Sequence, residues 1–172
     1  MALEYINKDI LQAFEEGEFD VLIHQTNCVS GTNVAGIAKA IFDKYPEAAE
    51  SHIDSEFSDW EVVNINDKQE IINCNSQYYP GNCSIKLFEY LGFQMPDNFH
   101  NRLQALENVL DSIVFYYALN IDKTLSFGIP LIGSGLGADY HLKGVMTDLE
   151  YFKKFIAPTV EKYLPNCKVY YL

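Results

Sequence analysis

A glycine-rich segment, residues 130–139, holds the pattern in this sequence that points most directly to ligand chemistry. It reads Pro-Leu-Ile-Gly-Ser-Gly-Leu-Gly-Ala-Asp, with glycine at the alternate positions 133, 135 and 137. Glycine lets the backbone approach a ligand closely and turn its N–H groups toward an anion. The segment lacks the Gly-Lys-Ser/Thr ending of a Walker loop and the G-x-G-x-x-G spacing of a dinucleotide fingerprint. The glycines alone therefore fit both a ligand loop and a plain tight turn.

A second segment, residues 24–38, joins a polar stretch to the predicted start of a helix. It reads His-Gln-Thr-Asn-Cys-Val-Ser-Gly-Thr-Asn-Val-Ala-Gly-Ile-Ala and leaves an apolar run at residues 21–25. The first N–H groups of a helix bind anions through their aligned dipoles. Taken by itself, the segment also fits a surface loop that ends in a helix N-cap.

The elements that must position these segments alternate along the chain. Short apolar runs predict strands at residues 3–6, 21–25, 60–65, 70–75, 124–129 and 168–172. Helices are expected at residues 10–16, 36–45, 48–57 and 142–155, and a strongly amphipathic one runs through residues 103–117. Residues 77–100, interrupted by prolines and glycines, read as a long loop with one short helix.

This alternation predicts an α/β fold with a mixed, mostly parallel sheet between helices. The length of 172 residues fits one domain. Ligands of such sheets bind outside the carboxyl ends of the strands, and both segments follow a strand end.

The composition limits the partners. With 24 acidic and 12 basic residues, the net charge of −12 excludes a protein that coats nucleic acid or binds membranes through basic patches. Because Arg102 is the single arginine, an anion site must rely on lysine or on backbone groups. The four cysteines form no C-x-x-C pair, and neither a leader nor a membrane-length apolar run is present. We expect a monomeric cytoplasmic protein that neither enters a membrane nor binds nucleic acid stably.

The two segments, in this order and spacing, resemble the ligand loops of the macro domain family, whose members bind ADP-ribose. The likeness lies in residues 23–28, 35–38, 44–48 and 129–137, and residues 7–10 and 169–172 fit as well. It is greatest to the small phosphatases that act on ADP-ribose 1''-phosphate. It covers almost the whole chain and implies a single macro domain over residues 1–172, a three-layer α/β/α sandwich.

The resemblance also implies ligand contacts. Asp9 is expected to accept a hydrogen bond from the adenine amino group, Ile10 to give a backbone contact, and Asn27 to reach the distal ribose. The distal ribose and diphosphate are expected to lie against Ala35, Gly36 and Ile37. The remaining contacts that it implies are the backbone of Gly133, Ser134, Gly135, Leu136 and Gly137 around the diphosphate. From residue type alone, Tyr140 is a candidate to stack on adenine, as are Tyr170 and Tyr171.

Structural alternatives stay open for several of these residues. Asp9 would also cap a helix that begins at Ile10, although a capping carboxylate still has a second oxygen to offer. Asn27 would also bond its own loop backbone. Tyr140 would also serve packing alone.

His24 and Asp139 resemble the pair proposed to perform the chemistry in the phosphatase branch. Removing a terminal phosphate requires a proton for the leaving oxygen, an oriented water and stabilised charge on the phosphoryl oxygens. His24 would supply the proton, Asp139 would orient or deprotonate the water, and Lys143 would join the backbone N–H groups in stabilising charge. The alternatives are a core histidine bonded to backbone for His24 and the N-cap of the following helix for Asp139.

Departures from the family pattern bear on the site. Val34 and Ala35 stand where the first loop of the family is usually richer in glycine, so a branched side chain narrows the space near the distal ribose. The strand ending at residues 73–77 offers no counterpart to the lysine that one branch of ADP-ribosyl-glutamate hydrolases uses for covalent attack. No carboxylate cluster marks a metal, and Cys28 reads as a small buried residue. We expect a site that uses neither a metal nor a cofactor.

The function favoured by the sequence is hydrolysis of ADP-ribose 1''-phosphate to ADP-ribose and phosphate. One alternative is a hydrolase that removes ADP-ribose from modified protein or nucleic acid, with Asp139 activating water against the anomeric carbon. The other is a non-catalytic module that captures ADP-ribose. In each case the partner is a small molecule or group of the ADP-ribose type.

Overall fold

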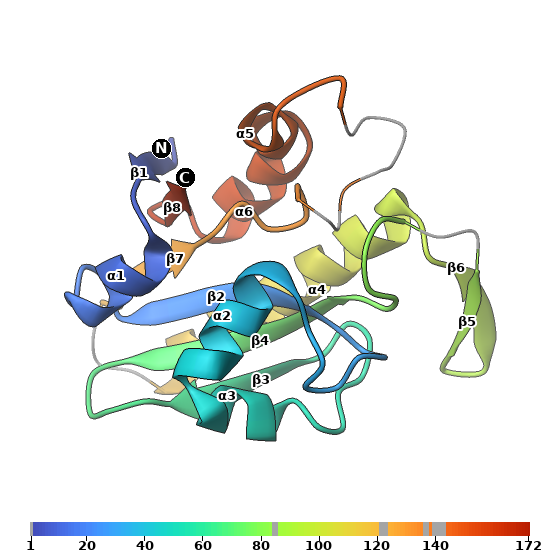
Figure 1. The fold of residues 1–172 in the computed structure, drawn as a ribbon, viewed down its shortest axis with the longest axis horizontal. Helices are drawn as coiled ribbons and strands as arrows, with labels where there is room; N and C mark the ends of the chain where they lie inside the picture. The colour runs from blue at the N-terminus through green and yellow to red at the C-terminus, as the bar shows by residue number, and fades with distance from the viewer. Residues whose placement is uncertain (1, 84–85, 121–123, 136–137, 139–143) are drawn as a thin grey trace.

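The computed structural model describes residues 2–83, 86–120, 124–135, 138 and 144–172, and its centre is one large sheet (Figure 1). Among these residues six strands pair in the order β1-β8-β7-β2-β4-β3. They are β1 (Glu4–Asn7), β2 (Val21–Asn27), β3 (Trp60–Asn64), β4 (Glu70–Gln77), β7 (Phe127–Ile129) and β8 (Lys168–Tyr171). All neighbouring pairs are parallel except β3 with β4. The predicted mixed, mostly parallel sheet is confirmed, although β7 is shorter than the strand expected at residues 124–129.

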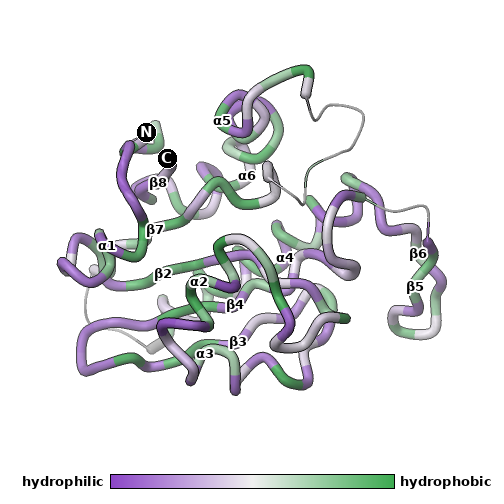
Figure 2. The backbone as a smooth tube through the Cα atoms, in the orientation of Figure 1, coloured by the Kyte–Doolittle hydropathy of each residue, from purple (hydrophilic) through white to green (hydrophobic). Residues whose placement is uncertain are grey.

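Strand β2 forms the middle of this sheet because its first residues are apolar in an unbroken run. Val21, Leu22 and Ile23 are almost completely buried, as expected for a parallel strand covered on both faces. Hydrophobic colouring likewise follows β7 beside it (Figure 2). Polar residues begin at His24, toward the carboxyl end of the strand.

Helices cover both faces of the sheet and complete the expected three layers. One face carries α1 (Ile10–Glu15), α2 (Gly36–Lys44) and α3 (Pro46–Ser51). The other carries α4 (Phe99–Asn120), α5 (Asp148–Tyr151), the π-helical turn η1 (Phe152–Ile156) and α6 (Ala157–Tyr163). Alternate residues of β2 serve the two cores, Leu22 on the first face and Ile23 on the second.

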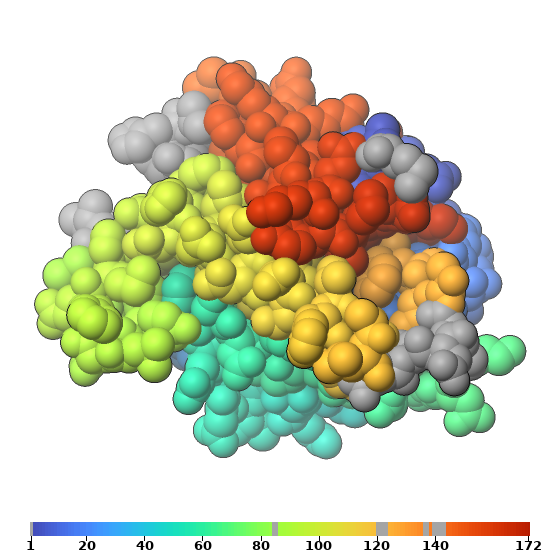
Figure 3. Space-filling model, turned by 180° about the vertical axis from the view of Figure 1, so that it is seen from behind, coloured from blue at the N-terminus to red at the C-terminus, as the bar shows by residue number. Residues whose placement is uncertain are grey.

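The second helical layer is visible from behind, where α4 lies between the C-terminal helices and the part of the chain around β3 (Figure 3). Lys162 on α6 donates to Glu107 on α4 at 2.7 Å and joins these two helices at the surface. No helix among the described residues is both long enough and apolar enough to cross a membrane.

The segment expected to be a loop with one short helix, residues 77–100, contains a hairpin instead. Strands β5 (Leu87–Tyr90) and β6 (Phe93–Pro96) form an antiparallel pair that extends from the body of the molecule (Figure 1). Its turn places Leu91 at φ 48° and Gly92 at φ 81°, the left-handed geometry that fits the twist of a two-residue hairpin. Leucine is disfavoured in that geometry, so the residues Leu91 and Gly92 did not indicate a hairpin turn in the sequence.

Two predicted helices also differ in position. The helix expected at residues 48–57 is α3, which starts at Pro46 and ends at Ser51. Of the helix expected at residues 142–155, residues 142 and 143 lie outside the described part and residues 144–147 are not helical. The helix starts at Asp148, where Thr147 and Glu150 form a capping box.

Candidate functional site

A cleft of about 410 Å³ opens at the carboxyl ends of β2, β4 and β7. Its size lies within the range of about 300–1,000 Å³ typical of small-molecule sites. Among the described residues it is lined by Gln25, Thr26, Asn27, Val34, Ala35, Gly36, Ile37, Ala38, Gln77, Pro80, Gly81, Pro130, Leu131, Ile132, Gly133, Gly135 and Asp148. The two segments singled out in the sequence therefore face the same space.

The start of α2 forms one wall of this cleft. The N-cap of α2 is Ala35, whose methyl side chain cannot accept a hydrogen bond from the helix. No acidic residue occupies the first turn of α2. Gly36 has φ +60°, a left-handed conformation that favours glycine. Because a helix cannot satisfy its own first N–H groups, those of this uncapped end are left for a ligand, and the helix dipole favours an anion there.

The second loop forms the facing wall. Gly133 adopts φ +72°, and both Gly133 and Gly135 line the cleft. Ser134 does not line it, because its hydroxyl donates to the Leu131 carbonyl at 2.5 Å and its N–H bonds the same carbonyl at 3.3 Å. Ser134 thus holds the loop in shape. The expected contacts Leu136, Gly137 and Tyr140, with Asp139 and Lys143, lie outside the described residues.

Asn27 is the last residue of β2, and the two polar atoms of its side-chain amide have different roles. Its Oδ1 accepts hydrogen bonds from the N–H groups of Val29 and Ser30, at 3.1 and 2.8 Å. This is the local loop bonding that was its structural alternative. Its Nδ2 has no hydrogen-bond partner among the described residues, although the residue is 9% exposed and lines the cleft. The side chain therefore supports its own loop and keeps two N–H donors for a ligand.

Asp9 and Ile10 lie at the start of α1 and are not among the residues that line the cleft. The Asp9 Oδ1 accepts from the Gln12 N–H at 2.9 Å, so Asp9 caps the helix. Its second oxygen has no hydrogen bond within the described part of the chain. The Ile10 side chain is buried in the core that Val34 and Ile37 also pack against, which links this corner to the cleft wall.

His24 is not brought to the cleft. Its side chain is completely buried on the α2 and α3 face, edge-on to Phe42, and its Nε2 lies 2.7 Å from the Asn73 Oδ1. The Asn73 Nδ2 donates to the Ala48 carbonyl, so the Asn73 Oδ1 is an acceptor and the His24 Nε2 carries the proton. Burial lowers the pKa of His24 to about 4. His24 therefore holds a core position, with a side-chain amide as its partner, and is not placed to protonate a ligand.

The thiol of Cys28, beside Asn27, is also unsuited to chemistry. Burial, together with the nearby Glu61 charge, raises the pKa of Cys28 to about 12. The sulfur donates weakly to the Gln77 carbonyl at 3.5 Å. An unactivated thiol agrees with the interpretation of Cys28 as a structural residue.

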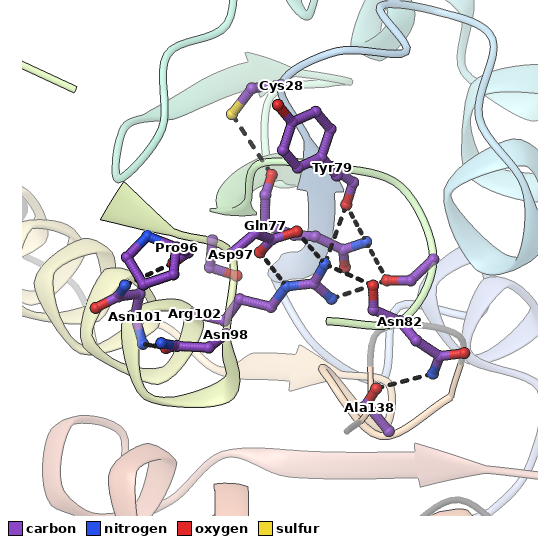
Figure 4. A network of polar contacts seen from close by, with 12 residues as sticks. Cys28, Gln77, Tyr79, Asn82, Pro96, Asp97, Asn98, Asn101, Arg102 and Ala138 are labelled. Carbon is purple, nitrogen blue, oxygen red and sulfur yellow. Dashed lines mark hydrogen bonds and ion pairs between the residues drawn. The ribbon is translucent and has the colours of Figure 1, made fainter. Parts of the chain in front are cut away.

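Residues 77–82, in the segment least well predicted from sequence, form the third wall. Gln77 donates through Nε2 to the carbonyls of Tyr79 and Gly81, at 2.7 and 2.9 Å. Arg102 binds this stretch from behind through Gly81, Tyr79 and Asn82 carbonyls and forms a bidentate ion pair with Asp97 (Figure 4). The single arginine is thus buried in structural bonds. No lysine or arginine occurs among the described residues that line the cleft.

Asp148 is the one ionisable side chain among the described cleft residues. It begins α5, and its Oδ2 would lie 3.8 Å from a methyl group placed on Gly135. Sequence reasoning missed it, because the capping box at Thr147 that fixes the helix start was not recognised. Gln25 and Gln77 also line the cleft and were not singled out in the sequence.

Within the described residues, no group of three or more His, Cys, Asp or Glu lies close enough to hold a metal ion.

No protein-family model matches this sequence, and no curated protein matches it either. Its similarity is to solved structures. A protein of unknown function from Bacteroides thetaiotaomicron has a TM-score of 0.68 and 18% identity, covering 100% of this chain and 99% of that one. The macrodomain of Thermus aquaticus DarG has a TM-score of 0.61 and 15% identity, covering 99% and 97% of the two chains.

A macrodomain protein from Streptomyces coelicolor agrees with these, with a TM-score of 0.61, 13% identity and coverage of 99% of both chains. This chain has the macrodomain fold. At such identities the likeness shows the fold alone, and it confirms the architecture implied by the sequence resemblance. The macrodomain fold places the loops after β2 and β7 at one end of the sheet, where the cleft lies.

Proposed function

We propose that this protein binds ADP-ribose in the cleft between α2 and the loop after β7. One observation carries the proposal: two backbone walls, the uncapped start of α2 and the Gly133–Gly135 turn, face each other across a cleft whose described lining holds no basic side chain. Backbone N–H groups and a helix dipole suit a diphosphate, which needs many donors and little fixed charge.

The two ends of the ligand are assigned from the macrodomain resemblance. The distal ribose would take hydrogen bonds from the free Asn27 Nδ2, with Val34 limiting the space beside it. The adenine amino group would donate to the second oxygen of Asp9, whose first oxygen caps α1. The ligand would extend from the cleft toward β1.

For chemistry we propose hydrolysis of ADP-ribose 1''-phosphate. A water oxygen bonds to phosphorus, the bond between phosphorus and the 1''-oxygen breaks, and a proton of the water ends on the 1''-oxygen, which gives ADP-ribose and inorganic phosphate. Asp139 is proposed to orient the water, and the backbone N–H groups to stabilise the phosphoryl charge. His24 takes no part, because it is buried away from the cleft.

A second activity is favoured by Asp148, a carboxylate on the cleft wall. Such a group can activate water against the anomeric carbon of ADP-ribose attached to a protein or nucleic acid. The product would be free ADP-ribose and the unmodified target.

The test measures phosphate released from ADP-ribose 1''-phosphate beside ADP-ribose released from modified protein and nucleic acid. Asp139→Asn is expected to abolish the first reaction and Asp148→Asn the second, whereas Asp111→Asn, on the exposed side of α4, changes neither. Calorimetry with ADP-ribose runs in parallel. Binding without any turnover would leave a capture module, and no binding at all would contradict the proposal.

A further inference from the structure

The pairing of β2 with β4 changes register where both strands reach the cleft. Residues pair regularly up to Gln25 with Cys74, and the next pair is Asn27 with Gln77. Two steps along β2 thus match three steps along β4, so β4 carries one extra residue. Bulges of this kind are rare in parallel pairs and are common beside active sites, where they re-aim side chains. Here both residues beyond the irregularity, Asn27 and Gln77, line the cleft.

A ring of polar side chains, all buried except Glu61, holds this irregularity from behind. The Thr26 hydroxyl donates to the Asn75 Oδ1 at 2.5 Å, and the Asn75 Nδ2 donates to the Glu61 Oε1 at 2.8 Å. The other Glu61 oxygen lies 3.5 Å from the His52 Nδ1. The His52 Nε2 lies 2.9 Å from the Asn27 carbonyl oxygen, next to Thr26, which closes the ring.

The ring is buried except at Glu61, whose side chain is 19% exposed. The His52 and Asn75 side chains are completely buried and Thr26 is 3% exposed. Two steps back along the same sheet face, beyond the buried His24–Asn73 pair, Leu22 and Ile71 belong to an apolar core. Buried polar groups add little net stability compared with well-packed apolar ones, but they fix geometry when every member is bonded. The ring therefore indicates that the ends of β2 and β4 at the cleft must be held in a fixed position.

We infer that His52 is a positioning residue of the cleft. A carbonyl oxygen only accepts, so the His52 Nε2 must carry the proton that it donates to Asn27. This bond fixes the Asn27 backbone, and the bonds from Val29 and Ser30 then fix the side chain so that Nδ2 faces the cleft. The assignment of ADP-ribose as the ligand rests on the proposed function, whereas the ring itself does not.

The first measurement uses the unaltered protein without ligand. The ¹⁵N shifts of the His52 ring are expected to show a proton on Nε2 with the shift of a hydrogen-bonded donor. A ring whose Nε2 carries no proton would overturn the inference. Because this measurement requires neither ADP-ribose nor a substitution, it decides the inference even if the proposed function fails or a variant does not fold.

The second measurement compares two amide replacements. His52→Gln retains an N–H group near the position of Nε2, whereas the shorter His52→Asn cannot reach the Asn27 carbonyl. His24→Asn is the matched control, because His24 is equally buried but bonds Asn73 and no cleft residue. His52→Asn alone is expected to shift the Val29 and Ser30 amides and to weaken ADP-ribose binding by about tenfold.

Coupling to Asn27 separates positioning from general damage. In an Asn27→Ala background, His52→Asn is expected to cause no further loss of affinity, because the donor that it positions is gone. Equal losses in both backgrounds, or amide shifts no larger than those of His24→Asn, would contradict the inference. Absence of binding by the unaltered protein would contradict the proposed function and leave the ¹⁵N and amide results to decide the role of His52.

Discussion

At the scale of single residues, the cleft depends on backbone positions that only glycine occupies without strain. Gly36 has φ +60° and would place a Cβ in open space on the cleft side of α2. Gly17, in the turn after α1, has φ +74° and also has open space around it, but it lies away from the cleft. The two glycines differ in location and share their geometry, which makes them a matched pair.

Gly36→Ala and Gly17→Ala are both expected to cost about 1–2 kcal/mol of stability, because an L-residue is strained at these angles. Only Gly36→Ala is expected to weaken ADP-ribose binding, by about tenfold, since its methyl group enters the space of the diphosphate. Thermal unfolding and calorimetry measure the two effects. Equal affinities for the two variants would remove Gly36 from the site.

His24 makes a prediction about pH. Burial lowers its folded pKa to about 4 from an ordinary value of 6.5. Between these values the unfolded chain binds a proton that the folded protein does not, so stability falls as the pH decreases from about 6.5 toward 4. Across pH 6.5 to 4.5 the loss from this residue is expected to be about 2–3 kcal/mol.

The measurement is urea unfolding at several pH values in that window, for the unaltered protein and His24→Leu. The variant is expected to lose the part of the pH slope that corresponds to one proton. Identical slopes would show that His24 is not the buried neutral histidine described here.

At the scale of elements, the sequence indicated most strands and helices because their apolar periodicity is strong. The apolar run at residues 21–23 is buried as expected, and so are Leu106, Leu110 and Ile113 of the predicted amphipathic helix. The hairpin was missed because its turn uses Leu91 in a left-handed conformation. The expected place of His24 in the cleft was also wrong. A histidine at the end of an apolar strand can face either the core or a cleft, and the sequence does not distinguish the two. The third wall of the cleft depends on long-range bonds to Arg102, which local pattern cannot show.

Arg102→Lys tests that wall. Lysine cannot form the bidentate pair with Asp97 and also bond the carbonyls of residues 79–82, so a buried carboxylate loses donors. We expect a loss of about 3 kcal/mol in stability and faster amide exchange in residues 78–82. Lys162→Met, which removes an exposed ion pair with Glu107, is the control and is expected to cost far less stability than Arg102→Lys. Unchanged amide exchange in Arg102→Lys would contradict this role of Arg102.

At the scale of the whole molecule, a net charge of −12 is compatible with a phosphate-bearing ligand because the proposed site binds the ligand through backbone N–H groups. The described cleft residues include no basic side chain. A site built from lysine and arginine loses affinity steeply as salt screens it. Here salt mainly screens repulsion between the acidic surface and the ligand. ADP-ribose affinity is expected to change by less than about twofold, or to rise slightly, from low to high salt. A steep fall measured by calorimetry would indicate basic groups in the site.

The most direct test of the central claim is an NMR titration of the ¹⁵N-labelled protein with ADP-ribose. We predict saturable shifts in the backbone amides of Gly36, Ile37, Gly133 and Gly135 and in the side-chain amide of Asn27, with Gly17 unaffected. These groups belong to the two walls of one cleft. Absence of saturable shifts, or shifts confined to residues outside this cleft, would contradict the account.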